Sequence, residues 1–210
     1  EHLINDATKE GYTGMRDTLA SGRFNVEELN LVEKDSVPAD AEILIIAGPK
    51  KDFMTHEIAE LTAYLHRGGK VLLMLEPDSS KTLQPLLTKY GVAWKEKKAV
   101  LERNRLQQLA DNNPLTPIVT SYDNNHEITR DARQMSIFAV ATPVEKAEKI
   151  PEGVTVSSLF STSKFSSEVS VEGNRLAVNE KNDRKGPLSL ALAVSGKVEK
   201  AGDKKEEKKK

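Results

Sequence analysis

The stretch from Ala41 to Pro77 constrains the fold more than any other part of the sequence. Its first apolar run, Ile43 to Ala47, is rich in β-branched residues and ends at a Gly-Pro pair. A helical pattern opens at Thr55, and a Gly-Gly pair ends it before a second apolar run, Val71 to Leu75. This order predicts a βαβ unit, in which a right-handed crossover helix joins two parallel strands. Such strands are normally buried on both faces.

The segments on either side continue the alternation of helix and strand. Lys9 to Leu19 predicts an amphipathic helix, Phe24 to Leu31 a strand, and Leu83 to Tyr90 a second amphipathic helix. Two short apolar runs, Val92 to Trp94 and Ala99 to Leu101, predict further strands. Because helices and strands alternate, we predict that residues 1–101 form an α/β core domain of three layers.

Residues 102–196 are richer in predicted strands than in helices. A short helix is predicted from Arg103 to Asp111, and a hairpin pairs Glu168–Val171 with Leu176–Val178. Further predicted strands are Pro117–Ser121, Met135–Thr142, Val154–Phe160 and Leu188–Val194. We predict that this part either continues the first domain or forms a small β-rich lobe. Residues 197–210 read KVEKAGDKKEEKKK, which predicts a charged, flexible linker or tail because such a composition cannot offset its ordering entropy.

Composition narrows the classes of function. The net charge is −1 although 30% of the residues are charged, so the sequence shows no general attraction to nucleic acid or to an anionic membrane. No apolar run reaches the roughly 20 residues of a membrane span. The absence of cysteine excludes disulfides, thiolate metal sites and a cysteine nucleophile. The chain opens at Glu1 without a targeting segment, and we interpret it as an excised fragment.

The first candidate site follows the strand that ends at Ala47. Gly48, Pro49 and Lys50 lie at the carboxyl edge, where α/β sheets bind ligands. Backbone N–H groups, lysines and the helix that opens at Thr55 are the elements of an anion or carboxylate site. The alternative is a tight turn with solvated lysines.

The second candidate site follows the strand that ends at Leu75. Glu76 and Asp78 lie where a nucleophile elbow would be, yet neither is a nucleophile of the Cys or Ser kind. They could bind a cation or a sugar hydroxyl, or they form a solvated acidic turn at a helix start. Thr162 and Ser163 could donate hydrogen bonds to a ligand, or they bond their own backbone in a turn. We predict no catalytic residues, no metal site and no cofactor.

Several segments carry a resemblance to a known family. They are TKEGYTGMRDTL, VPADAEILIIAGPKKDFMTHEIAELTAYLHRGGKVLLMLEP, LLTKYGVAW, LFSTSKFSS and NDRKGPLSLALAV. Together they resemble the soluble domain of the gliding-motility-type ABC transporter auxiliary proteins, a family of uncharacterised transport components with remote similarity to intraflagellar transport proteins. Phe165 stands where the family pattern often has Trp, which puts any role of an indole N–H there in doubt.

The resemblance also implies a fold, a location and partners that the residues alone do not indicate. It implies a mostly parallel sheet similar to class I glutamine-amidotransferase-like (flavodoxin-like) domains, with a more strand-rich second half. It implies a periplasmic or extracytoplasmic domain, anchored by membrane helices outside this chain, that acts with an ABC permease and an ATPase. It also implies one further strand before Glu1 and another after the charged linker, so the fragment would have exposed sheet edges.

Three functions stay open at this point. The prediction is a non-catalytic auxiliary domain of an ABC-type transport or gliding-motility system that binds a partner protein or an unknown ligand. The alternative is a receptor domain for a small-molecule or glycan substrate. The third is a degenerate hydrolase of the amidotransferase-like fold, which the absence of a nucleophile argues against.

Overall fold

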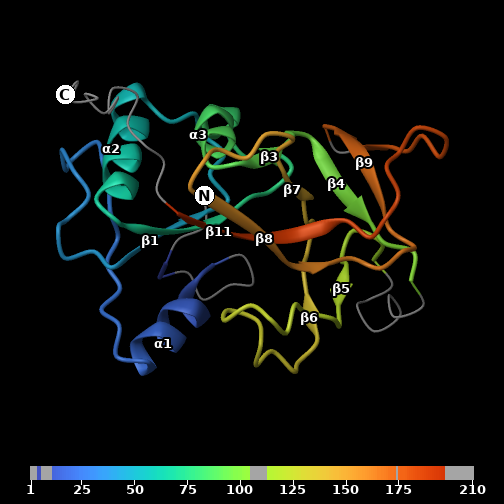
Figure 1. Ribbon diagram of the computed structural model, residues 1–210, viewed down its shortest axis with the longest axis horizontal. Coiled ribbons are helices and arrows are strands. Elements are labelled where there is room, and N and C mark those ends of the chain that lie inside the picture. Colours follow the sequence, from blue (N-terminus) through green and yellow to red (C-terminus); the bar gives the residue numbers. More distant parts are fainter. Residues whose placement is uncertain (1–3, 6–10, 105–112, 174, 197–210) are drawn as a thin grey trace, which may run out of the picture. The chain divides into compact units, whose positions relative to one another are not determined.

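The computed structural model describes residues 4–5, 11–104, 113–173 and 175–196. The chain divides into two compact units, Glu1–Leu83 and Gln84–Lys210, which we call the first and second unit (Figure 1). The predicted tail at 197–210 and most of the helix predicted from Arg103 to Asp111 lie outside the described residues.

The first unit contains the predicted βαβ arrangement. Its elements are α1 (Thr13–Ser21), β1 (Ile43–Ala47), α2 (Thr55–His66), β2 (Lys70–Met74) and the short 3-10 helix η1 (Lys81–Leu83). Strands β1 and β2 are parallel, with Ile43 opposite Lys70 and Ala47 opposite Met74. The prediction of a βαβ unit is therefore confirmed. The strand predicted from Phe24 to Leu31 is wrong, because these residues form neither helix nor strand; Glu28 interrupts the apolar alternation that a strand face needs.

The second unit is built mainly of antiparallel strands. Its elements are α3 (Gln84–Lys89), β3 (Val92–Trp94), β4 (Lys98–Leu101), β5 (Ile118–Val119), β6 (Ser136–Ile137), β7 (Val144–Lys146), β8 (Val154–Ser161), β9 (Ser167–Glu172), β10 (Arg175–Ala177) and β11 (Ser189–Gly196). The sheets are β10-β9-β4, β11-β8, β3-β7 and β5-β6, each antiparallel throughout. The predicted hairpin is confirmed as β9 and β10.

The predicted three-layer, mostly parallel sheet is wrong, and with it the arrangement expected of a class I glutamine-amidotransferase-like (flavodoxin-like) domain. Within the described ranges, β1–β2 is a two-stranded parallel sheet, and the other paired strands are antiparallel in separate small sheets. The strands predicted at Val92–Trp94 and Ala99–Leu101 do exist, but they pair with β7 and β9 instead of extending β1–β2. An apolar pattern in the sequence indicates that a segment forms a strand, but it does not specify which strand pairs with it.

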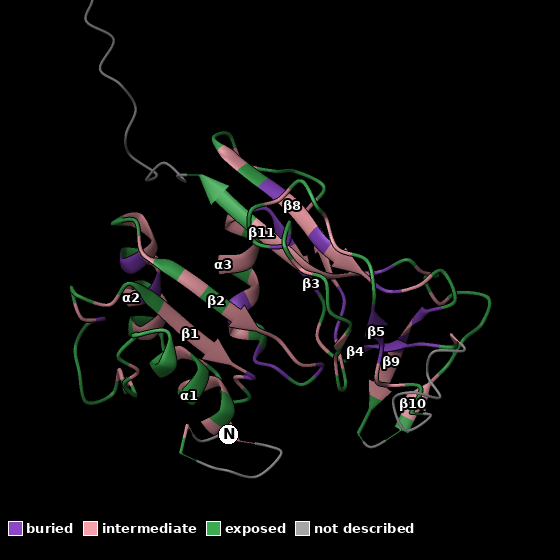
Figure 2. Ribbon diagram, turned by 90° about the horizontal axis from the view of Figure 1, so that it is seen from below, coloured by how far each residue is buried: buried purple, intermediate pink, exposed green. Residues whose placement is uncertain are grey.

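Burial differs sharply between the strand pair β4–β9 of the second unit and the pair β1–β2 of the first unit. Ala99 and Val169 are fully buried and Leu101 nearly so, and Leu115, Val171 and Leu176 pack against this cluster, which lies where β4 pairs with β9. Figure 2 shows buried residues along strands of the second unit. Neither β1 nor β2 contains a buried residue. Among the helices of the described residues, none is long and apolar enough to cross a membrane.

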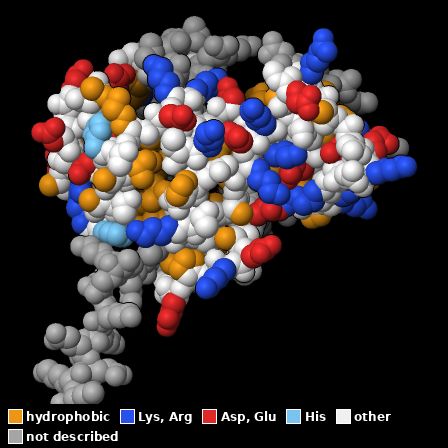
Figure 3. All heavy atoms as spheres, turned by 90° about the horizontal axis from the view of Figure 1, so that it is seen from above, with side chains coloured by type: hydrophobic (Ala, Val, Ile, Leu, Met, Phe, Trp, Pro, Cys, Tyr) orange, Lys and Arg blue, Asp and Glu red, His pale blue; other side chains and the backbone are white. Residues whose placement is uncertain are grey.

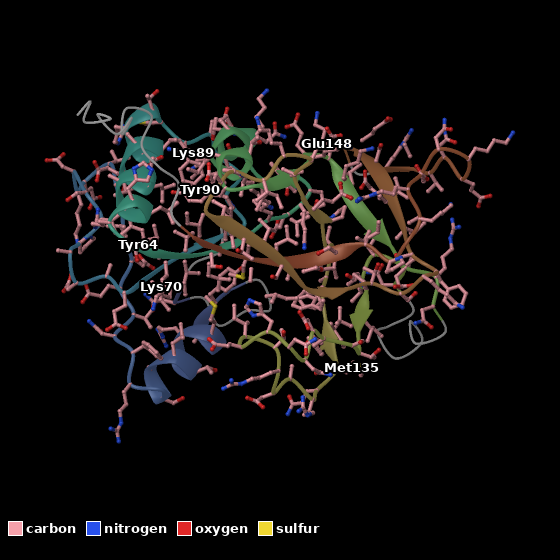
Figure 4. The ribbon with its side chains drawn as sticks, viewed as in Figure 1. Tyr64, Lys70, Lys89, Tyr90, Met135 and Glu148 are labelled. Carbon is pink, nitrogen blue, oxygen red and sulfur yellow. The ribbon has the colours of Figure 1, made fainter. Side chains whose placement is uncertain are left out.

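The side chain of Tyr64 connects α2 to the segment just before β1 and to the first residue of β2. Its ring is 1% exposed, and its hydroxyl lies 3.2 Å from the carbonyl oxygen of Ala41 and 3.3 Å from that of Lys70. Figure 4 shows Tyr64 and Lys70 near each other. Gly69 donates its N–H to the Tyr64 carbonyl at 2.9 Å, so the chain turns closely around the ring. A side chain at Gly69 would meet that ring, with contacts of 2.4 to 2.6 Å.

We therefore expect Gly69→Ala to lower the free energy of unfolding by about 1–3 kcal/mol, because the added methyl group must displace a buried aromatic ring. Gly14→Ala in α1 is the matched control, since an added Cβ meets nothing within 4 Å there. It should leave stability unchanged or raise it by up to about 1 kcal/mol. Chemical denaturation of both variants measures this difference. Equal midpoints for the two would show that Tyr64 does not restrict position 69.

Candidate functional site

The carboxyl ends of β1 and β2 bring together the residues predicted there. Because the strands are parallel and Ala47 lies opposite Met74, the two loops that follow leave the same edge. Gly48 adopts a positive φ of 52° and donates its N–H to the Met74 carbonyl at 2.9 Å. Ser80 donates its N–H to the Pro49 carbonyl at 2.6 Å, so hydrogen bonds hold the two loops against each other.

Lys50 lies between the two predicted carboxylates. Its Nζ is 3.5 Å from Glu76 Oε2 and 3.5 Å from Asp78 Oδ2. The charge of Glu76 and then that of Asp78 raise the pKa of Lys50 above its ordinary value. All three side chains are about a third or more exposed, so water screens these ion pairs and each contributes little to stability. The cluster carries two negative charges and one positive charge, which favours a cation or a hydroxyl group over an anion as its ligand.

The start of α2 also disfavours an anion. The carboxylate of Glu57 accepts a hydrogen bond from the Met54 N–H, with Oε2 at 2.7 Å, in a capping arrangement at the first turn. A negative side chain therefore already occupies the positive end of the helix dipole. Lys50 and the helix start, which together suggested an anion site, are thus both engaged with carboxylates of the chain.

Two buried serines hold the loops of this site. Ser79 and Ser80 are both 3% exposed. Ser79 Oγ accepts the Glu76 N–H at 2.8 Å, and Ser80 Oγ donates to Asp52 Oδ1 at 2.8 Å. Both hydroxyls thus fix the backbone that follows β1 and β2. These contacts are structural, whereas the side chains of Lys50, Glu76 and Asp78 are 45%, 32% and 63% exposed.

Thr162 and Ser163 belong to the second unit, and both of their hydroxyls bond to the protein. Thr162 Oγ1 accepts the Leu188 N–H at 2.8 Å and lies 2.6 Å from Ser166 Oγ. Ser163 donates to Glu102, with its Oγ 2.7 Å from Oε1 and its N–H 3.2 Å from Oε2. Glu102, which sequence reasoning missed, is 1% exposed. Its one signal in the sequence is an acid directly after the apolar run Ala99–Leu101.

A cavity of about 350 Å³ lies in the second unit beside these residues. Hydroxyl groups and two aromatic rings dominate its lining: Ser121, Tyr122, Asp123, Ser158, Leu159, Phe160, Ser161, Thr162 and Pro187. The Tyr122 and Phe160 rings pack edge to face with centroids 5.5 Å apart. Sequence reasoning missed this cavity because its walls come from three segments that are far apart in the chain, at 121–123, 158–162 and 187. The signal in the sequence was the serine-rich run at 157–163.

Charged groups of both signs are distributed over the surface, and the described residues contain no cluster of metal ligands. On the face shown in Figure 3, Lys and Arg side chains lie among Asp and Glu side chains. Over the described ranges, no group of three His, Asp or Glu side chains is placed so as to hold a metal ion.

Comparison with known proteins identifies a family and a related fold. A family model described as an ABC-type uncharacterized transport system matches residues 6–210. No curated protein sequence matches the chain significantly. Among solved structures, the mmIFT52 N-terminal domain is similar, with a TM-score of 0.54 and 21% sequence identity over 78% of this chain and 73% of that chain. At this identity the likeness concerns the fold alone.

The cluster at the carboxyl edge predicts unequal effects of its two carboxylates. Glu76→Gln should lower the pKa of Lys50 more than Asp78→Asn does, because the charge of Glu76 is the larger cause of the upward shift. The raised pKa stabilises the fold at pH values below the ordinary lysine value of 10.5, and this small contribution is lost as pH rises through the folded pKa. NMR titration of the Lys50 side chain measures both variants. An unchanged pKa in both would mean that the ion pairs do not form in solution.

Proposed function

The chain belongs to the ABC-type uncharacterized transport system auxiliary family, and we propose that it is a non-catalytic domain that binds a partner protein at the extracytoplasmic face of the membrane. The partner that we propose is the ABC permease, because it is the subunit of such a system that spans the membrane. We further propose that the ATPase belongs to the same assembly and that gliding motility is among the uses of the system, as the resemblance noted in the sequence implies.

The apolar sheet formed by β1 and β2 carries this proposal. All five residues of β1 and four of the five in β2 are apolar, yet none is buried; Ile43 and Leu72 are 49% and 47% exposed. Parallel strands are normally covered on both faces. Within the described residues each strand pairs only with the other, so each also has an unpaired edge. An extended apolar segment of a partner can complete such a sheet by main-chain hydrogen bonds.

The carboxyl edge supports a role other than catalysis. The hydroxyls of Ser79 and Ser80 are engaged in loop contacts, and Lys50 is paired with Glu76 and Asp78. The sequence contains no cysteine. We propose that Gly48, Pro49, Lys50, Glu76 and Asp78 form a polar border beside the apolar sheet.

A second candidate function is that of a substrate receptor, and the cavity beside β8 favours it. Its hydroxyl groups, two aromatic rings and one carboxylate suit a neutral polyhydroxylated molecule, which binds through hydrogen bonds and stacking on rings. In this candidate Thr162 contributes to the ligand site from the cavity wall, and Ser163 holds the loop behind it.

The partner proposal is tested with Leu72→Asp, which places a charge at the centre of the apolar sheet. We expect at least a tenfold loss in co-purification with the permease of the same transport system. Val32→Asp is the matched control, because Val32 is 67% exposed in the same unit but lies outside the sheet. Thermal unfolding confirms that both variants are folded. Equal retention of the permease by a folded Leu72→Asp would contradict the proposal.

The receptor candidate is tested with a panel of neutral mono- and disaccharides. Ser161→Val should weaken binding at least fivefold by removing a hydroxyl from the cavity wall. Ser157→Val, in the same strand but outside the lining, should leave binding unchanged. Isothermal titration calorimetry gives the affinities, and absence of binding to the unaltered chain would remove this candidate.

A further inference from the structure

The turn formed by residues Thr162–Ser166, here called the 162–166 turn, is held in one conformation by many hydrogen bonds. Thr162 exchanges two bonds with Leu188: its N–H donates to the Leu188 carbonyl at 2.9 Å, and its Oγ1 accepts the Leu188 N–H at 2.8 Å. Ser166 Oγ donates to the Ser163 carbonyl at 2.9 Å, and the Gly186 N–H donates to the Ser166 carbonyl at 2.8 Å. Both ends of the turn are therefore fastened to the segment before β11.

The middle of the turn is fastened to a buried carboxylate. Glu102 is 1% exposed and accepts bonds from Ser163 Oγ and N–H and, at 3.1 Å each, from the N–H groups of Arg103 and Asn104. Among the described residues no cation pairs with it. Burying a carboxylate is unfavourable unless hydrogen bonds replace its water, and here four neutral donors do so. The interior thus holds a carboxyl group whose contacts include two to the turn.

The tip of this turn carries an exposed aromatic ring. Phe165 is 56% exposed, although its own N–H donates to Ser163 Oγ at 3.0 Å. The ammonium group of Lys164 lies 5.2 Å from the centroid of the ring. An exposed phenyl group on a backbone that is already ordered loses little conformational entropy when it binds, which is a feature of binding hot spots.

The charge beside the ring is positive. Lys185 forms a β-bridge with Ser167, two residues beyond Phe165. Neither Lys164 nor Lys185 has an ion pair among the described residues. The neighbouring acid, Glu168, is paired with Arg184 at 2.5 Å, and Glu102 is buried. A carboxylate from outside the chain would therefore meet uncompensated lysines.

We propose that the 162–166 turn is a docking hot spot for a protein whose apolar pocket receives the Phe165 ring and whose pocket rim carries carboxylates facing Lys164 and Lys185. A rigid single ring suits a shaped protein pocket better than a lipid surface, which binds through several apolar side chains at one depth. The inference rests on the proposed function in that the partner is taken to be the ABC permease of the same system.

The first test replaces Phe165 with the photo-cross-linking residue p-benzoylphenylalanine in cells that contain the complete transport system. A cross-link to the permease supports the proposal. Ile128, 68% exposed in the same unit, is the control position and should give none. A cross-link to lipid alone, or none at position 165, overturns the proposal.

The second test compares variants in co-purification with the permease. Phe165→Ala and Lys164→Glu should each reduce the retained permease at least tenfold, whereas Phe165→Trp should retain it, because an aromatic ring still fills the pocket. The unfolding midpoints of these variants should match that of the unaltered chain, since both positions are exposed. If Leu72→Asp removes the permease and Phe165→Ala does not, the hot spot is wrong and the proposed function stands. If the unaltered chain retains no permease, both the hot spot and the proposed function are wrong.

A third test asks whether Glu102 holds the 162–166 turn in place. In Glu102→Gln an NH₂ group replaces one of the two carboxylate oxygens, and this group cannot accept the hydrogen bonds that the oxygen accepted. Hydrogen exchange of the Phe165 amide should therefore be faster, and permease binding should be weaker. Unchanged exchange and binding would contradict the role of Glu102 as a positioning residue.

Vesicles of phosphatidylcholine and phosphatidylglycerol should not bind the chain. Vesicle binding that Phe165→Ala abolishes would overturn the protein partner in favour of a lipid surface.

Discussion

The antiparallel register of β4 with β9 is the constraint on which the second unit depends. It places Leu101 opposite Ser167, and the same pair of strands contributes the fully buried Ala99 and Val169. Since Glu102 directly follows Leu101 and the 162–166 turn directly precedes Ser167, the register also brings the carboxylate to the turn. A slip of one residue would turn the apolar side chains away from the core and separate Glu102 from Ser163. Core packing and the presentation of Phe165 thus have a common origin.

The first unit follows a different principle. Its two strands are joined by one crossover helix and meet at a polar carboxyl edge, where Lys50 is matched to two carboxylates. The polar groups of that edge are largely engaged with one another, while the apolar strands remain partly open to solvent.

In the function that we propose, the two units contribute surfaces of different kinds. The first offers backbone edges and an apolar sheet, which suit an extended segment of a partner. The second offers a rigid turn with an aromatic ring and lysines, which suits a shaped pocket with an acidic rim. Two dissimilar surfaces can act on one partner and raise its apparent affinity through effective concentration, without either surface being strong by itself.

The sequence by itself determined the local elements: the βαβ unit, the hairpin of β9 and β10, and the loops in which Lys50, Glu76 and Asp78 meet. These follow from apolar periodicity, glycine positions and the rule that parallel strands end at one edge, all of which are short-range. Only the tertiary structure decided that β3 and β4 pair with β7 and β9, and that Glu102 bonds Ser163 from 61 positions away. The physical reason is that backbone hydrogen bonds are the same for every strand. A sequence pattern therefore states which face of a strand is buried but not which strand lies beside it.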